Sequence, residues 1–303
     1  MKIKKEKIIL DVDTGTDDAF AIILAEKSGK FNIQGITTVA GNTNLRQVIK
    51  NTQKVLNLMG RLDIPIFKGA SKPLKGKGRR SKTQGRDGFC EVYLPLPKQK
   101  LNNVKAEDYI AKTVSEHPKE ITIVATAPLT NIAKTIKKYP EIKNKIKRII
   151  IMGGVVEVSG NVTEFSEFNF YNDPEAGKIV FESKVPIILI PLDVTMKLLL
   201  KRNWLIKKYK KSKDKITKFI INVVNNRYKL VGKDWMYLHD PLAVGAAINK
   251  NFVQTKKDRL EIITSGKQKG KIIKNKKGER IEWAFKVKEK EFLDYFEKTL
   301  LKL

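Results

Sequence analysis

The chain has 303 residues, of which 41% are hydrophobic, and its 61 basic and 32 acidic side chains give a formal net charge of +29. No apolar run approaches the roughly 20 residues of a membrane helix, and no segment has the pattern of a signal peptide. We therefore exclude a membrane-spanning class and expect a soluble, cytoplasmic protein. No stretch rich in Pro, Gly or Ser divides the chain, so we expect a single domain over residues 1–303.

The positive charge needs an explanation, because a strongly basic chain is typical of nucleic-acid-binding proteins. Only 10 of the 61 basic residues are Arg and 51 are Lys, whereas recognition of phosphates and bases favours the guanidinium group. The lysines are spread over nearly every segment, as a coding bias of the genome would spread them. We therefore do not expect nucleic acid as a partner, although a positive surface can still attract anionic ligands.

The amino-terminal part of the chain indicates a buried strand that leads into a helix. Ile8 to Leu10 form an apolar run, Gly15 interrupts it, and apolar residues recur at helical spacing from Ala19 onward. Four carboxylates lie at this corner, with no His or Cys near them, which predicts an all-oxygen site for Ca²⁺ or Mg²⁺ and argues against zinc. These carboxylates are Asp11, Asp13, Asp17 and Asp18. A helix start with solvated acidic residues would explain Asp17 and Asp18, but it would not explain Asp11 and Asp13.

Strand and helix patterns then alternate. We expect strands at residues 32–40, 64–67, 120–125, 148–152 and 186–190, and helices at residues 44–59, 106–116, 129–138 and 174–182. Strands separated by helices of this length pair in parallel through right-handed crossovers. The pattern predicts an α/β fold with a doubly wound, mostly parallel central sheet and helices on both faces. Ligands of such folds bind beyond the carboxyl ends of the strands.

Polar segments follow the predicted strands where this rule places a ligand. Three are turns, at residues 41–43, 126–131 and 152–154, and any one of them alone could be an ordinary loop. A longer segment, residues 160–176, carries amides and a carboxylate that suit recognition of sugar hydroxyls, namely Asn161, Glu167 and Asn169. Asp173 and Pro174 within it indicate an ordinary helix start.

The remaining candidates are two histidines and one cysteine. His117 precedes Pro118 at the end of a predicted helix, and we expect a solvated helix terminus there. His239 and Asp240 begin another predicted helix, which places an imidazole beside a carboxylate, although such a pair alone is weak evidence. Cys90 is the single cysteine of the sequence, so it cannot form an intrachain disulfide and we expect an unreactive thiol.

Together these motifs resemble the inosine-uridine-preferring nucleoside hydrolase family, whose amino-terminal signature has the form DxDxGxDDAxA. Residues 11–21 match it, with Thr14 where the family usually has proline. Residues 167–177 closely match the family's EFN-x-x-x-DPEAA element, residues 239–243 match its HDP-x-A element, and the resemblance extends from Ile8 to Leu300. It implies the nucleoside hydrolase fold and cleavage of the N-glycosidic bond of ribonucleosides.

The resemblance also implies roles for individual residues. Calcium is expected to bind Asp13, Asp18, Asp240 and the main-chain carbonyl of Thr126, with Asp13 as the general base that activates a calcium-bound water. His239 is expected on the side of the leaving base, as its acid. The residues expected to contact the ribose are Asp17, Asn42, Asn161, Glu167 and Asn169. A homodimer or homotetramer and a role in purine and pyrimidine salvage are implied as well.

One further residue departs from the family pattern, and two segments have more than one possible role. Many family members have a histidine in an HG-x-DGL element where this chain has Gln84, so the base preference is open. The segment around it, residues 69–88, suits either a mobile flap over the pocket or a disordered basic loop. Residues 204–235 form a second candidate lid, but its aromatic residues Tyr228, Trp235 and Tyr237 are expected in the core.

Two rival functions remain at this point. A haloacid-dehalogenase-type phosphatase also begins with a hydrophobic strand followed by DxDxT, which residues 8–14 satisfy, with Asp11 as nucleophile and Asp13 as acid and base. Its later acidic element has no convincing counterpart in this sequence. A protein that binds nucleosides or nucleic acid without turnover is the alternative from a different functional class.

Overall fold

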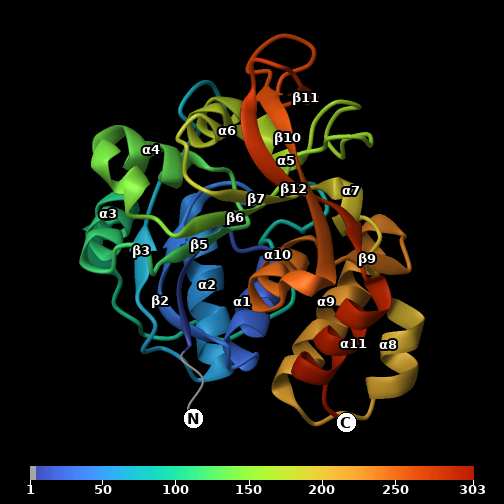
Figure 1. Cartoon of the computed structure of the whole chain (residues 1–303). Coiled ribbons are helices and arrows are strands. Elements are labelled where there is room, and N and C mark those ends of the chain that lie inside the picture. The colour runs from blue at the N-terminus through green and yellow to red at the C-terminus, as the bar shows by residue number, and fades with distance from the viewer. Residues whose placement is uncertain (1–4) are drawn as a thin grey trace.

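The computed structural model describes residues 5–303 (Figure 1). Its strands are β1 (Glu6–Val12), β2 (Phe31–Thr38), β3 (Ile66–Lys68), β4 (Asn102–Lys105), β5 (Thr122–Ala125), β6 (Arg148–Met152), β7 (Ile187–Ile190), β8 (Leu199–Lys201), β9 (Trp235–Tyr237), β10 (Val253–Ile262), β11 (Ile272–Lys274) and β12 (Glu279–Val287). Its helices are α1 (Thr16–Lys27), α2 (Leu45–Met59), α3 (Ala106–Glu116), α4 (Thr130–Lys138), α5 (Phe168–Asn172), α6 (Pro174–Phe181), α7 (Leu192–Thr195), α8 (Arg202–Tyr209), α9 (Lys215–Val231), α10 (His239–Ile248) and α11 (Glu289–Leu300).

One large sheet organises the molecule. Its order is β11-β10-β12-β7-β6-β5-β1-β2-β3-β4. The strands from β12 to β4 pair in parallel, and β10 pairs antiparallel with β11 and β12. The short strands β8 and β9 form a separate antiparallel ribbon. The predicted mostly parallel sheet is therefore confirmed, with an antiparallel extension at one edge.

The central strands are hydrophobic on both sides, as expected for a parallel sheet covered on both faces. Along β1, Ile8 and Leu10 pack into one core while Ile9 packs into the other. The helices α1, α2, α9, α10 and α11 cover the first face, and α3, α4 and α6 cover the second (Figure 1). This arrangement confirms helices on both faces, and it brings the carboxyl ends of β1, β5 and β6 to the same edge.

Local sequence signals account for most helix boundaries. Asn44 caps α2 by accepting a hydrogen bond from the Gln47 N–H at 3.0 Å, and Gly60 ends this helix in the left-handed conformation at φ 70°. Asp173 accepts from the Ala176 N–H at 3.1 Å, with Pro174 at the first helical position. The predicted bounds of α3 and β6 match the structure, and the other predicted elements differ by one or two residues.

Two further sequence expectations have an outcome here. His117 ends α3 as expected, but it is not a purely solvated terminus, because its Nδ1 lies 3.1 Å from Lys7 Nζ and its ring is half-buried. Cys90 is buried, and burial raises the pKa of its thiol to about 12, which agrees with an unreactive residue. None of the helices formed by residues 5–303 has both the length and the apolar character needed to span a membrane.

Candidate active site

A cavity of about 330 Å³ opens beyond the carboxyl ends of the central strands. Its position is the one that the topology of a doubly wound sheet predicts for a ligand. Most residues singled out from the sequence line it, namely Asp13, Asp17, Asn42, Thr126, Asn161, Glu167, Asn169, His239 and Asp240. Asp18 is fully buried and lies next to the cavity, in contact with residues of its lining.

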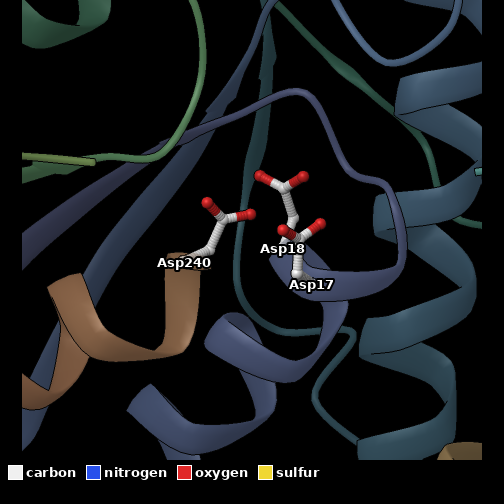
Figure 2. A group of neighbouring side chains, drawn as sticks. All are labelled: Asp17, Asp18 and Asp240. Carbon is white, nitrogen blue, oxygen red and sulfur yellow. The ribbon is translucent and has the colours of Figure 1, made fainter. Parts of the chain in front are cut away.

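Three carboxylates meet at the floor of the cavity, from two helices that are far apart in the sequence. Asp17 and Asp18 lie in the first turn of α1, and Asp240 lies in the first turn of α10 (Figure 2). One oxygen from each lies within 4.8 Å of the others. Helices α1 and α10 pack side by side under the sheet edge, which explains how residues from opposite ends of the chain come together.

Asp13 is not one of these three acids, but it lies close enough to Asp18 and Asp17 for their charges to repel. Its Oδ2 accepts a hydrogen bond from the Asn42 N–H at 2.6 Å, whereas its buried Oδ1 has no hydrogen-bond partner among residues 5–303. Gly41 is required at this point, because a Cβ there would overlap the Asp13 carboxylate. A buried carboxylate oxygen without a partner is costly unless a ligand satisfies it.

Burial and mutual repulsion strongly disfavour the charged forms of these acids. Burial, followed by the charge of Asp18, raises the pKa of Asp13 well above its ordinary value. Burial and then Asp17 raise the pKa of Asp18 to about 7, and burial and the neighbouring aspartates raise the pKa of Asp240 well above its usual range. A divalent cation would offset this repulsion, and carboxylate oxygens are the ligands that a hard cation prefers. The residues present therefore fit a metal site.

Hydrogen bonds hold the floor in place. Asp18 Oδ1 accepts from the Thr126 hydroxyl at 2.8 Å, and its Oδ2 accepts from the Gly15 N–H at 3.0 Å and from Asn42 Nδ2 at 3.1 Å. The side chain of Asn42 therefore contacts an acid of the floor rather than standing free. These bonds connect the turns that follow β1, β2 and β5.

The wall beside the floor comes from α5 and the turn after β6. Glu167 is buried and accepts from three backbone N–H groups, those of Gly154 at 2.9 Å, Asn169 at 2.9 Å and Phe170 at 3.2 Å. Burial raises its pKa to about 7 despite these bonds. Because both of its oxygens already accept hydrogen bonds, a sugar hydroxyl would have to share them.

The two amides of this wall differ in exposure. Asn169 is buried, and its Nδ2 donates to the carbonyl of Thr126 at 3.0 Å and to that of Met152 at 3.2 Å. Asn161 is exposed, and its Oδ1 accepts from the Phe168 N–H at 3.0 Å. Asn169 thus fixes the carbonyl expected to bind the metal, a link that sequence reasoning did not anticipate.

His239 and residues near it also line the cavity. The His239 Nδ1 lies 2.7 Å from the Thr195 hydroxyl, and burial lowers the pKa of the ring to about 4, so the imidazole is neutral near pH 7. The ring of Tyr237 lies 5.1 Å from that of His239 and also lines the cavity, as does Arg227. Sequence reasoning assigned Tyr237 to the core and did not single out Arg227. The strand-to-helix corner just before His239 was the available signal.

Hydrogen bonds hold both residues that depart from the family motifs. Where proline is usual, the Thr14 hydroxyl lies 2.7 Å from that of Thr52, which ties the loop to α2. Gln84 Nε2 donates to Asp17 Oδ1 at 3.0 Å, and its Oε1 accepts from the N–H of Thr16 at 2.9 Å and from the hydroxyl of Thr16. Gln84 therefore binds the first turn of α1. Both the oxygen and the nitrogen of its amide contact other residues of the protein.

Asp11 lies outside the cavity lining, contrary to the expectation that all four amino-terminal carboxylates gather there. Its Oδ1 accepts from the Thr37 hydroxyl at 2.6 Å and from Asn131 Nδ2 at 2.7 Å, and the side chain is fully buried. A phosphatase of the alternative type needs this carboxylate as an accessible nucleophile. The structure therefore argues against that alternative.

Comparison with known proteins agrees with the geometry. The model of the inosine-uridine preferring nucleoside hydrolase family matches residues 8–294. Uridine nucleosidase 1 of Arabidopsis thaliana is 34% identical over 269 residues, covering 87% of this chain and 80% of that protein. The pyrimidine-specific ribonucleoside hydrolase RihA of Escherichia coli O1:K1 is 42% identical over 191 residues, covering 63% of this chain and 61% of its own length.

Solved structures give the same result. A plant nucleoside hydrolase, the PpNRh1 enzyme, superposes with a TM-score of 0.92 at 29% identity, covering 99% of this chain and 100% of its own. A purine-preferring ribonucleoside hydrolase from Gardnerella vaginalis gives a TM-score of 0.91 at 31% identity, covering 97% and 98%. The chain belongs to the inosine-uridine preferring nucleoside hydrolase family, and it is an N-glycosyl hydrolase of ribonucleosides.

Proposed function

We propose that the cavity hydrolyses ribonucleosides to ribose and free base with the help of a calcium ion held by Asp13, Asp18, Asp240 and the carbonyl of Thr126. The observation that carries this proposal is the buried Asp13 Oδ1, which has no hydrogen-bond partner among the described residues, on a side chain that interacts with Asp18 and Asp17 of the acid group. A calcium ion bound there would lower the pKa of a water ligand and orient it toward the sugar.

Asp13 is the proposed general base. The Asn42 N–H fixes the orientation of its carboxylate, and a carboxylate that binds the metal lies within reach of a proton on a metal-bound water. In the balanced reaction, the water oxygen forms a bond to the anomeric carbon while the bond from that carbon to the base nitrogen breaks. Asp13 receives one water proton, and the other stays on the new hydroxyl of the sugar. The base leaves with the bonding electron pair and takes one proton from solvent, to which Asp13 later returns the proton it received.

The ribose is proposed to lie between the floor and the wall. Asp17 and Asn42 would contact its 2′ and 3′ hydroxyls from the acidic side. The other side of the sugar would face Asn161, Glu167 and Asn169. Hydroxyls that both donate and accept hydrogen bonds match this mixture of amides and carboxylates, so a sugar lacking one of them would leave a buried group unpaired.

His239 is proposed to assist the leaving base as a hydrogen-bond donor. Because its pKa is lowered, the ring is neutral, and a Thr195 hydroxyl that donates to Nδ1 would place the ring hydrogen on Nε2. Nε2 has no hydrogen-bond partner among residues 5–303 and belongs to a side chain that lines the cavity. It would then donate to an atom of the purine or pyrimidine as negative charge develops there.

Release of free base from a panel of ribonucleosides and 2′-deoxyribonucleosides tests the proposal. We expect turnover of ribonucleosides, its loss after treatment with a chelator, and its recovery on adding calcium, with magnesium as the comparison. Turnover that survives complete removal of divalent ions would overturn the metal role. The named relatives include both uridine-acting and purine-preferring enzymes, so uridine and inosine belong in the same panel.

The other expectations stay predictions that biochemistry has to test. These are a cytoplasmic location, a role in purine and pyrimidine salvage, one domain over residues 1–303, and a homodimer or homotetramer. Gel filtration with light scattering measures the last of them.

A further inference from the structure

The mouth of the cavity carries a group of cations that the reaction on a neutral nucleoside does not use. Arg79, Arg80 and Lys82, here called the basic rim, all line the cavity and are exposed. Within the described part of the chain, no carboxylate forms an ion pair with any of them. Their charges are therefore available to a ligand.

The basic rim is attached to the sugar side of the cavity. The Arg79 N–H donates to Asn172 Oδ1 at 2.6 Å, at the end of the helix that carries Asn169. The Ser81 N–H donates to the Asn42 carbonyl at 3.3 Å, next to the acidic floor. The rim segment therefore runs from the ribose wall to the floor. The residues of the base side, Tyr237 and His239, lie on other elements.

The type of cation distinguishes this rim from the general lysine excess of the chain. The cavity is lined by 24 of the 303 residues, so an even distribution would place about one of the 10 arginines and about four of the 51 lysines there. Three arginines and two lysines are found, and two of the three cations of the rim are arginines, whereas arginine provides only 10 of the 61 basic residues of the chain. Guanidinium is enriched and ammonium is not, which coding bias toward lysine does not explain. Guanidinium binds phosphate oxygens in a bidentate manner.

We infer that the enzyme also accepts nucleoside 5′-monophosphates, with the 5′-phosphate bound by the basic rim. This inference rests on the proposed function, in which the 2′ and 3′ hydroxyls face Asp17 and Asn42. The 5′ position is then the ribose substituent left for the sugar side of the mouth, where the rim lies. The reaction is unchanged in its balance: water adds to the anomeric carbon, the base leaves protonated, and the second product is ribose 5-phosphate.

The charge distribution of the cavity supports this placement. The floor is acidic and would repel a phosphate, whereas the rim lies at the opening and is cationic. A substrate with its diol at the floor and its phosphate at the mouth matches both regions. Glu167, the acid of the wall, already accepts three backbone N–H groups, which reduces its repulsion of a nearby anion.

The test compares two triple variants that remove the same number of charges from the same segment. One is Arg79→Gln, Arg80→Gln and Lys82→Gln. The matched control is Lys72→Gln, Lys75→Gln and Lys77→Gln, whose three side chains are exposed and do not line the cavity. Base release from uridine and from uridine 5′-monophosphate gives kcat/KM for each, and inorganic phosphate is tested separately as a competitive inhibitor.

We expect the wild type to release uracil from the nucleotide. The rim variant should lower the ratio of kcat/KM for the nucleotide to that for uridine by about tenfold or more, mainly through KM, while the control variant keeps the wild-type ratio. An equal fall in both variants would show general attraction by the net charge and would overturn the inference. A wild type that releases no uracil from the nucleotide would also overturn it, whether or not it binds the nucleotide or inorganic phosphate. Failure of the proposed function is a separate result, because uridine itself would then release no base.

Discussion

The two ends of strand β1 each carry a buried or half-buried carboxylate, but the neighbours of the two carboxylates have opposite charges. At the amino end, Glu6 accepts hydrogen bonds from Lys147 Nζ at 2.8 Å and from the Thr122 hydroxyl at 2.6 Å, and it pairs with Arg148 Nη2 at 3.1 Å. Burial alone would raise the pKa of Glu6, but these partners lower it below its ordinary value. Its charge is fully compensated by the protein.

At the carboxyl end, Asp13 follows the same strand and has other carboxylates as neighbours. Burial and the charge of Asp18 raise its pKa, and one of its oxygens has no hydrogen-bond partner within the described chain. The comparison teaches that basic side chains of the protein neutralise the charge of Glu6, which serves structure. The charge of Asp13 is left to be neutralised by a ligand. Substitutions at the two ends should therefore separate stability from activity.

The largest expected effect is that of Asp13→Asn. Removing the proposed base should lower base release from uridine and inosine by at least about 10²- to 10⁴-fold. The melting temperature in the presence of chelator should not fall, because the change removes one of several carboxylates that repel each other. Steady-state assays and thermal melts measure the two quantities. A variant with nearly full activity would contradict the role of Asp13.

A smaller loss is expected for His239→Ala, which tests the base side of the site. We expect a fall in kcat of about tenfold to a hundredfold for inosine and a smaller fall for uridine, since the change removes the donor to the leaving base. Thr195→Val should show the same direction with a smaller size, because it removes only the bond that orients the ring. Unchanged hydrolysis of inosine by His239→Ala would show that the assigned role is wrong.

Gln84→Leu tests whether this residue holds the acidic corner. The variant loses the bonds to Thr16 and to Asp17, so we expect KM for ribonucleosides to rise by about tenfold, with a smaller change in kcat. Gln84→Glu keeps the shape but places a carboxylate against Asp17, and it should be at least as harmful. Should both variants keep the wild-type KM, Asp17 would be positioned by other contacts.

The smallest effect is expected at the amino end of β1, for Glu6→Gln. Because the pKa of Glu6 is lowered in the folded protein, its stabilisation is fully present above the pKa of the unfolded chain and is lost as the pH falls through the folded value. We expect a loss of about 1 kcal/mol in unfolding free energy near pH 7 and a difference that shrinks below about pH 4. Denaturant titrations at both pH values measure it. Activity should not change, and a loss of activity as large as that of Asp13→Asn would break the comparison.

Much of the fold was predictable because the central strands and their helices follow simple periodic patterns. The strand β6 is an apolar run after its first residue, Arg148, and α3 has clear helical spacing with a polar boundary on each side. The antiparallel strand β10 was not predicted, since it is rich in charged residues and only partly buried. Its hydrophobic pattern is too weak to distinguish an edge strand from a loop.

Site residues that belong to a sequence motif were predictable. Contacts between segments that are far apart in the sequence were less predictable. The acids of α1 and α10 were expected to meet, and the structure brings one oxygen of each within 4.8 Å of the others. The bond from Asn169 to the Thr126 carbonyl depends on how α5 packs against the turn after β5, which no local pattern encodes. The same holds for Gln84, whose partners lie 67 and 68 positions away.

The burial of Cys90 has a practical consequence for studying how the mouth of the cavity moves. Because this is the one cysteine of the sequence and its thiol is shielded, a maleimide dye should leave the folded native protein unlabelled. A cysteine introduced at Lys77, just outside the basic rim, would then carry a single fluorophore. Its emission would follow ligand entry in real time without any prior removal of native thiols.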